Sequence, residues 1–147
     1  MKLIVFDDAQ KFSTEVRPYL EEREVENSLF LGVLAMQPID SRVESHLMVL
    51  VQDQDEVVMA AYMGALNLII SGGPTGALSL VLKKLLELGI DVPGVVGRSN
   101  ESELFAQEWM KVRGCRSTLA MDQMIYELRR VVRPNGVNGR MRVAKPN

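Results

Sequence analysis

Apolar and polar positions along the chain predict strands separated by helices. Residues 2–6 form a β-branched run that stops at two aspartates, which is typical of a short strand. From residue 9 to about residue 37, apolar positions recur at four-residue spacing, which predicts helix. Pro18 fits poorly inside a helix, so we expect two helices with a break or kink near it, and Pro38 to stop the second.

The middle of the chain predicts a β-hairpin and then a strand that leads into a glycine-rich turn. The apolar runs 45–52 and 56–63 flank a polar turn at 53–55, which favours two antiparallel strands. A third strand is expected over 66–71. The sequence Ser-Gly-Gly-Pro-Thr-Gly then precedes an apolar periodic stretch that predicts a helix over about 75–88.

The last third of the chain is less uniform. Gly89 is placed to end the preceding helix, a short buried strand is expected over 93–97, and a helix over about 100–113. The stretch 116–132 fits a helix face and also runs mostly apolar at period two, and periodicity alone favours helix. Strands separated by helices indicate an α+β fold, and the early hairpin makes an α/β-type mixed sheet the expected arrangement.

Composition narrows the class of protein without naming a chemistry. The chain has 147 residues, 47% of them apolar and 24% charged, with a net charge of −2, which is ordinary globular composition for one domain. No global basic field favours nucleic acid or an acidic membrane, and no apolar run approaches the roughly 20 residues of a membrane span. Cys115 is the only cysteine, which fits a reducing compartment, so we expect a cytoplasmic protein.

The glycine turn is the first place where chemistry could lie. A helix N-terminus preceded by glycines offers unpaired N–H groups to a phosphate. However, Ala77 and Leu78 stand where a Walker motif has Lys and Ser or Thr, and the dinucleotide glycine pattern is not met. No arginine or lysine lies between residues 65 and 82, and Pro74 removes one N–H donor. A tight strand-to-helix turn is the favoured interpretation, and a phosphate cradle is the alternative.

Other chemistry-bearing residues have structural interpretations. His46, the only histidine, has no companion at metal-ligand spacing, so we expect no metal site. Cys115 has no sequence partner and reads as a small residue at a strand start. Trp109 is expected in the core, and Asn27 is placed to hydrogen-bond inside the fold. A run of acidic residues is interpreted as a solvated face of the second helix; its members are Glu21, Glu22, Glu24 and Glu26.

The order of the predicted elements, together with five short stretches, resembles the GNAT N-acetyltransferase family. The resemblance is to the N-terminal half of bacterial two-domain GNAT proteins and spans nearly the whole chain. The stretches are REVENSLFLGVL (23–34), NLIIS (67–71), PGVVG (93–97), FAQEW (105–109) and YELRRVVRPNGVNGRMRVA (126–144).

This resemblance implies a GNAT-like fold, in which helices flank a central mixed sheet and residues 116–132 form a long strand. It implies an N-terminal domain over 1–133 and a linker over 134–147 that leads to a C-terminal catalytic GNAT domain. That domain would be the partner of this one, a homo-oligomer is a further possibility, and acetyl-CoA would be the cofactor of the parent protein.

The family binds the cofactor's pyrophosphate at the position of the glycine turn, with Gln/Arg-x-x-Gly-x-Gly/Ala. Only Gly73, Gly76 and Ala77 match remnants of that pattern, and the Gln/Arg anchor is missing. Tyr126 lies in the late strand region, but its context does not match the family's general acid, so no catalytic residue is assigned. We therefore expect a non-catalytic domain of an acetyl-CoA-dependent N-acetyltransferase. The alternatives are a domain that binds coenzyme A at 71–77, a free-standing interaction module, and a small nucleotide-binding α/β protein of another fold.

Overall fold

The computed structural model describes residues 1–36, 47–64, 66–132, 135–136 and 139. Within these residues the chain forms five strands and four helices. In chain order they are β1 (Lys2–Val5), α1 (Ala9–Glu21), α2 (Ser28–Met36), β2 (Leu47–Asp53), β3 (Glu56–Met63), β4 (Leu68–Ile70), α3 (Thr75–Glu87), β5 (Val95–Val96) and α4 (Ser99–Arg113).

The strands form one mixed sheet in the order β1-β2-β3-β4-β5. The first three neighbouring pairs are antiparallel, and β5 lies parallel to β4, with Leu68 opposite Val95. The predicted hairpin is confirmed: Gln54 and Asp55 connect β2 to β3 and have φ angles of 50° and 68°, as a two-residue type I′ turn requires. The expected α+β class with a mixed sheet is therefore confirmed.

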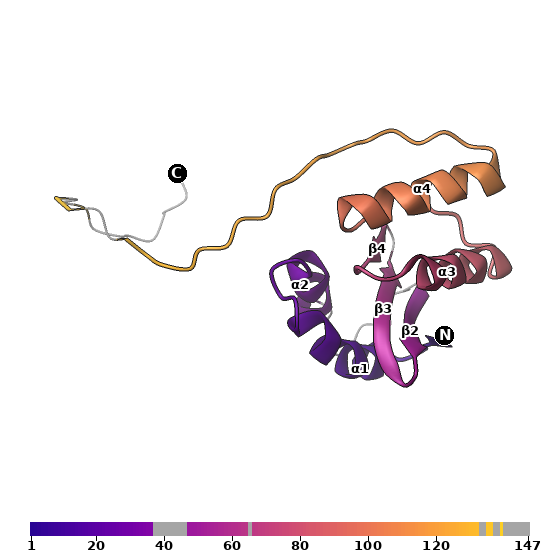
Figure 1. Cartoon of the computed structure of the whole chain (residues 1–147), viewed down its shortest axis with the longest axis horizontal. Coiled ribbons are helices and arrows are strands. Elements are labelled where there is room, and N and C mark those ends of the chain that lie inside the picture. The colour runs from indigo at the N-terminus through magenta and orange to yellow at the C-terminus, as the bar shows by residue number, and fades with distance from the viewer. Residues whose placement is uncertain (37–46, 65, 133–134, 137–138, 140–147) are drawn as a thin grey trace, which may run out of the picture.

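Helices cover both faces of the sheet, with α1 and α2 on one side and α3 and α4 on the other (Figure 1). Alternate residues of β2 supply the two cores, because successive side chains of a strand point to opposite faces. Leu47 and Val49 belong to the core beneath α3 and α4, whereas Met48 belongs to the core beneath α1 and α2. The two central strands are therefore apolar on both sides, which explains their nearly continuous hydrophobic runs.

The two N-terminal helices form as predicted, but the break between them comes later than Pro18. Pro18 lies inside α1, which ends at Glu21, and turns at 22–27 connect it to α2. Proline removes one helical hydrogen bond, yet the buried stripe of α1 holds the helix against the sheet on both sides of it. That stripe consists of Phe12, Val16 and Leu20. The expected stop at Pro38 lies outside the described residues.

The helices on the other face also follow the sequence. α3 ends at Glu87, and Gly89 has a φ of +65°, which confirms the prediction that this glycine ends the helix. α4 buries Phe105 and Trp109, whose stacked rings have centroids 5.7 Å apart, so the expected core position of Trp109 is confirmed.

After α4 the chain departs from both expectations. Residues 116–132 form neither the helix favoured by periodicity nor the strand implied by the resemblance, and every residue from 111 to 132 is exposed. The chain leaves the folded body after Gly114, which adopts a left-handed conformation at the end of α4 (Figure 1). Both predictions were wrong because each requires a surface that covers the apolar side chains, and the body covers none of them. The predicted linker at 134–147 lies outside the described residues, apart from 135–136 and 139.

Candidate functional site

A cleft of about 310 Å³ opens where β4 and β5 end. Its position follows from topology, since the carboxyl ends of adjacent parallel strands point to one edge of a sheet, a common place for ligands. The segment between α1 and α2 forms one wall, and β3 with the glycine turn forms the other. The cleft is lined by Tyr19, Glu22, Arg23, Glu26, Asn27, Val57, Val58, Gly72, Gly73, Pro74 and Arg98.

Hydrogen bonds around Ser71 hold the glycine turn in place. The Ala60 N–H donates to Ser71 Oγ at 2.8 Å, and the Ser71 N–H donates to the Ala60 carbonyl at 3.0 Å. The Tyr19 hydroxyl crosses from α1 and donates to the Gly72 carbonyl at 2.7 Å, and it lies 3.3 Å from Ser71 Oγ. These contacts tie α1, β3 and the turn into one unit at the floor of the cleft.

A β-bulge explains why Tyr19 also reaches β3. The register between β2 and β3 shifts at Val51 and Gln52, which pair with Met59 and Val57 and leave Val58 without an opposite residue. Such a bulge redirects backbone groups away from the ladder. The Val58 carbonyl lies 3.0 Å from the Tyr19 hydroxyl, which donates to it.

The Tyr19 phenol is kept neutral by its surroundings. Burial raises the pKa of Tyr19 above its ordinary value of 10.0, and the nearby Ser71 hydroxyl and the positive charges of Arg23 and Arg98 oppose that rise. A neutral phenol that donates to backbone carbonyls holds the fold together. It is not placed to remove a proton from a substrate.

The charges at the mouth of the cleft balance one another. Arg98 Nη1 lies 3.2 Å from Glu26 Oε2, and Arg98 Nε lies 3.9 Å from Glu101 Oε2. Arg23 Nη1 lies 3.8 Å from the same Glu26 oxygen. Arg98 and Glu26 are 41% and 45% exposed, so solvent screens the pair and its contribution to stability is small.

The three residues predicted to bind a cofactor, Gly73, Gly76 and Ala77, each contact a different part of the protein. A Cβ on Gly73 would lie 2.7 Å from the Val58 carbonyl oxygen, so the turn packs directly on β3 there. Gly76 is exposed, and a Cβ on it would lie 3.3 Å from the Met1 side chain. The Ala77 side chain is buried, and its N–H donates to the Pro74 carbonyl at 2.9 Å. These residues surround the start of α3, but only Gly73 lines the cleft.

Sequence reasoning missed Arg98 and Tyr19. Arg98 lies two residues after the end of β5, so the rule about the ends of parallel strands could have placed it beside the turn after β4. A Cβ on Gly72 would lie 2.9 Å from Arg98 Nη1, so the cation that the turn lacks in sequence comes from this residue. Tyr19 carries no comparable local signal. Asn27, in contrast, donates from Nδ2 to the Leu20 carbonyl at 3.0 Å, as expected.

The acidic residues do not form a face of the second helix. Glu21 ends α1, whereas Glu22, Glu24 and Glu26 lie in the turns before α2. They were misplaced because helical spacing continues across the turns. Glu22 and Glu26 line the cleft, although all four side chains reach solvent.

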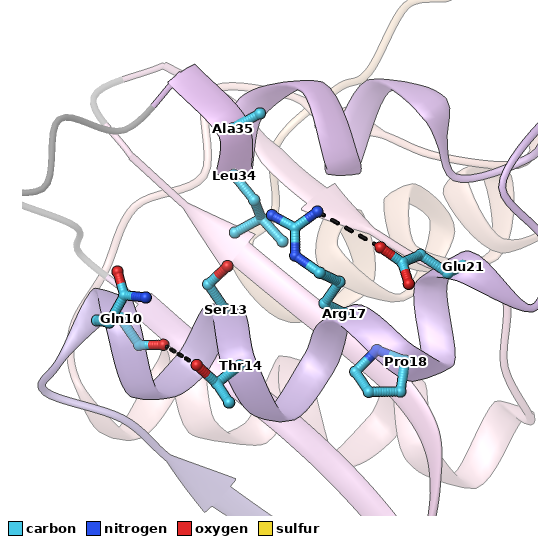
Figure 2. A pocket seen from close by; sticks show the side chains of 8 residues that line it. All are labelled: Gln10, Ser13, Thr14, Arg17, Pro18, Glu21, Leu34 and Ala35. Atoms are coloured by element: carbon cyan, nitrogen blue, oxygen red, sulfur yellow. Dashed lines mark hydrogen bonds and ion pairs between the residues drawn. The ribbon is translucent and has the colours of Figure 1, made fainter.

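A second hollow, of about 390 Å³, lies between α1 and α2 (Figure 2). Its visible polar contacts remain within α1, where Arg17 Nη1 lies 3.5 Å from Glu21 Oε1 and Thr14 Oγ1 donates to the Gln10 carbonyl. Pro18, Leu34 and Ala35 complete the lining together with Ser13. The ion pair and the hydrogen bond join neighbours on a single helix, and the lining presents no converging set of catalytic groups.

The remaining candidates add no chemistry to the cleft. Cys115 is exposed just beyond α4, and no strand begins at it; His46 lies outside the described residues. Within the described part of the chain, no three or more His, Cys, Asp or Glu side chains gather to hold a metal. None of the helices described there is long and apolar enough to cross a membrane. Comparisons with protein-family models, with curated proteins and with solved structures found no match.

Proposed function

We propose that this chain is a GNAT-like N-terminal domain that does not itself catalyse acetyl transfer and that packs against an acetyl-CoA-dependent N-acetyltransferase domain. The arrangement of elements supports the fold. Three antiparallel strand pairs lead through a glycine turn and a helix to a parallel fifth strand, which is the order that the sequence resemblance implies as far as α4. The partner domain and its acetyl-CoA rest on the sequence resemblance.

The contacts of the glycine turn carry the non-catalytic part of the proposal. A pyrophosphate at the start of α3 needs unpaired backbone N–H groups and room beside them. Pro74, the N-cap of α3, has no N–H to offer, and the Ala77 N–H already donates to the Pro74 carbonyl at 2.9 Å. Met1 packs against Gly76, and Arg98 is engaged by Glu26. The protein's own groups therefore occupy part of the space and bonding capacity that the cofactor would require.

The cleft also offers little for the chemistry of acetyl transfer. Attack by an amine needs a deprotonated nucleophile and a polarised thioester carbonyl, hence a base and oriented donors. The phenol of Tyr19 donates to backbone carbonyls, and the carboxylate of Glu26 is paired with Arg98 and Arg23. This arrangement suits a structural wall that borders a neighbouring domain's acceptor site.

One observation favours the alternative in which this domain binds coenzyme A. Arg98 lies beside Gly72 and supplies the positive charge that the turn lacks in sequence. A phosphate that displaced Glu26 would gain that guanidinium as a bidentate partner.

Calorimetry with acetyl-CoA separates the two functions. The non-catalytic proposal expects no binding heat with ligand at about millimolar concentration, the weak end of specific binding. Saturable binding that Arg98→Gln abolishes would overturn it in favour of the coenzyme A site. Arg113→Gln is the matched control, because that arginine lies at the far end of α4. The partner domain has its own test, because the reading frame beyond residue 147 should encode an intact Gln/Arg-x-x-Gly-x-Gly pattern, and its absence would refute the pairing.

A further inference from the structure

The segment after α4 presents apolar side chains to water. From residue 118 to residue 132 it is exposed and has no regular secondary structure, and it runs away from the folded body (Figure 1). Near its start, the Ser117 N–H lies 3.2 Å from Met110 Sδ of α4. Eight large apolar side chains follow, each 58–84% exposed: Leu119, Met121, Met124, Ile125, Tyr126, Leu128, Val131 and Val132. So dense an exposed apolar stretch marks an interaction surface.

The pattern of this segment fits a strand that is covered on both faces. At period two, one side would carry Leu119, Met121 and Ile125, and the other Met124, Tyr126 and Leu128. Strands with apolar residues on both sides lie inside sheets whose two faces are both covered by helices. The sheet of this protein is of that kind, since α1 and α2 cover one face and α3 and α4 the other.

The sheet has an edge that such a strand could complete. Among the described residues, β5 pairs only with β4, so its outer edge has unpaired backbone groups. Val95 and Val96 are half-buried there. The opposite edge, β1, is less suitable because it carries charges. Lys2 is its first residue, and the N-terminal amino group beside it lies 3.2 Å from Asp53 Oδ1. Charges of this kind discourage edge-to-edge pairing.

We propose that residues 118–131 of one copy add as a strand at the β5 edge of a second copy and extend beyond the two residues of β5, in a reciprocal dimer. One molecule carries both the unpaired strand and the unpaired edge, so two copies satisfy both in a closed two-fold arrangement. The two segments together carry fourteen large apolar side chains. Full coverage of these side chains, at roughly 60–120 Å² each, would bury about 800–1,700 Å². A specific dimer needs about 1,200–2,000 Å².

This inference concerns self-association and does not depend on acetyl-CoA or on a partner domain. Sedimentation of the whole chain should give a species of twice the 16.4 kDa chain mass. Hydrogen exchange should show that the amides of 118–131 and of 95–97 become protected together, increasingly so as protein concentration rises. Ile125→Asp should weaken the dimer at least tenfold and remove both protections. Ile125 is exposed in the single chain, so the body should fold in this variant.

The matched control is Val5→Asp, on the exposed side of β1 at the opposite edge, which should leave the dimer intact. A monomer at about 100 µM would overturn the proposal, since interfaces of this area associate at micromolar concentrations or below. Protection of the segment that does not depend on concentration would overturn it in favour of pairing with the chain's own β5. Dissociation by Val5→Asp would overturn the assignment to the β5 edge.

Discussion

Two glycines of the same turn should respond oppositely to replacement by alanine. Gly73 and Gly76 have equivalent roles if the turn binds a pyrophosphate, but the structure gives them different neighbours. A Cβ on Gly73 would lie 2.7 Å from the Val58 carbonyl oxygen and 2.9 Å from Met59 Cβ, both on a central strand. A Cβ on Gly76 would lie 3.3 Å from the flexible end of the Met1 side chain. Neither glycine has a positive φ, so the contrast tests packing alone.

The expected magnitude for Gly73→Ala is about 1–3 kcal/mol of lost stability. Inserting a methyl group into packed surroundings costs roughly 1–3 kcal/mol. Moving the Val58 carbonyl would also weaken its 3.0 Å hydrogen bond with Tyr19, for up to about 1 kcal/mol more. Alanine also restricts the unfolded chain more than glycine does, which offsets roughly 0.4–1 kcal/mol of the lost stability. Gly76→Ala should be neutral or should stabilise the protein by up to about 1 kcal/mol, because alanine favours helix and Met1 can move aside.

Urea unfolding followed by the fluorescence of Trp109, the only tryptophan, measures both changes. In thermal unfolding at this chain length, Gly73→Ala should lower Tm by roughly 4 °C for each kcal/mol of lost stability. The packing argument would be refuted if Gly73→Ala changed the free energy of unfolding by less than about 0.5 kcal/mol, the usual range of inert surface changes. Equal destabilisation by both variants would refute it as well.

Two further variants test the floor of the cleft and the larger core. Tyr19→Phe should cost about 1–2 kcal/mol at pH 7, because it removes the phenol that donates to the Gly72 and Val58 carbonyls, although Ser71 Oγ still donates to the Gly72 carbonyl at 3.1 Å. Burial raises the Tyr19 pKa above 10.0, so the folded state holds the phenol proton more tightly; urea titrations should show this contribution complete below pH 10 and declining as the pH rises further. Phe105→Ala should cost about 3–5 kcal/mol by calorimetry, against less than about 0.5 for the exposed control Val112→Ala.

The sequence predicted correctly those elements that depend on residues close together in the chain. The hairpin followed from two apolar runs and a polar turn, and Gly89 ends α3 because its left-handed conformation suits glycine. Asn27 reached the Leu20 carbonyl seven residues away, a contact that its apolar neighbours suggested. The site depended on longer distances. Tyr19 meets the Gly72 carbonyl 53 residues further along the chain, and no spacing rule connects an α1 residue to a turn after β4.

The glycine turn shows why a motif's position and its contacts must be judged separately. The pattern of residues correctly predicted that the turn connects a strand to a helix. It could not show that Gly73 is pressed against the bulged residue Val58, because the bulge arises from the pairing of β2 with β3. The position of Arg98 beside Gly72 could be inferred from the sequence only once β5 was assigned as the parallel neighbour of β4, which the pattern of apolar residues does not specify.

The segment 116–132 marks the limit of pattern reading most clearly. Its apolar positions satisfy a helix of period 3.6 and, less completely, a strand of period two. In other parts of the chain a neighbouring surface resolves such an ambiguity; Phe105 and Trp109 of α4, for example, pack against the sheet. Residues 116–132 have no such surface on their own body. An apolar pattern predicts that a segment becomes buried, whereas the surface that buries it determines whether the segment is a helix or a strand. A backbone that pairs with the β5 edge would have to be a strand, so the partner would decide what the sequence left open.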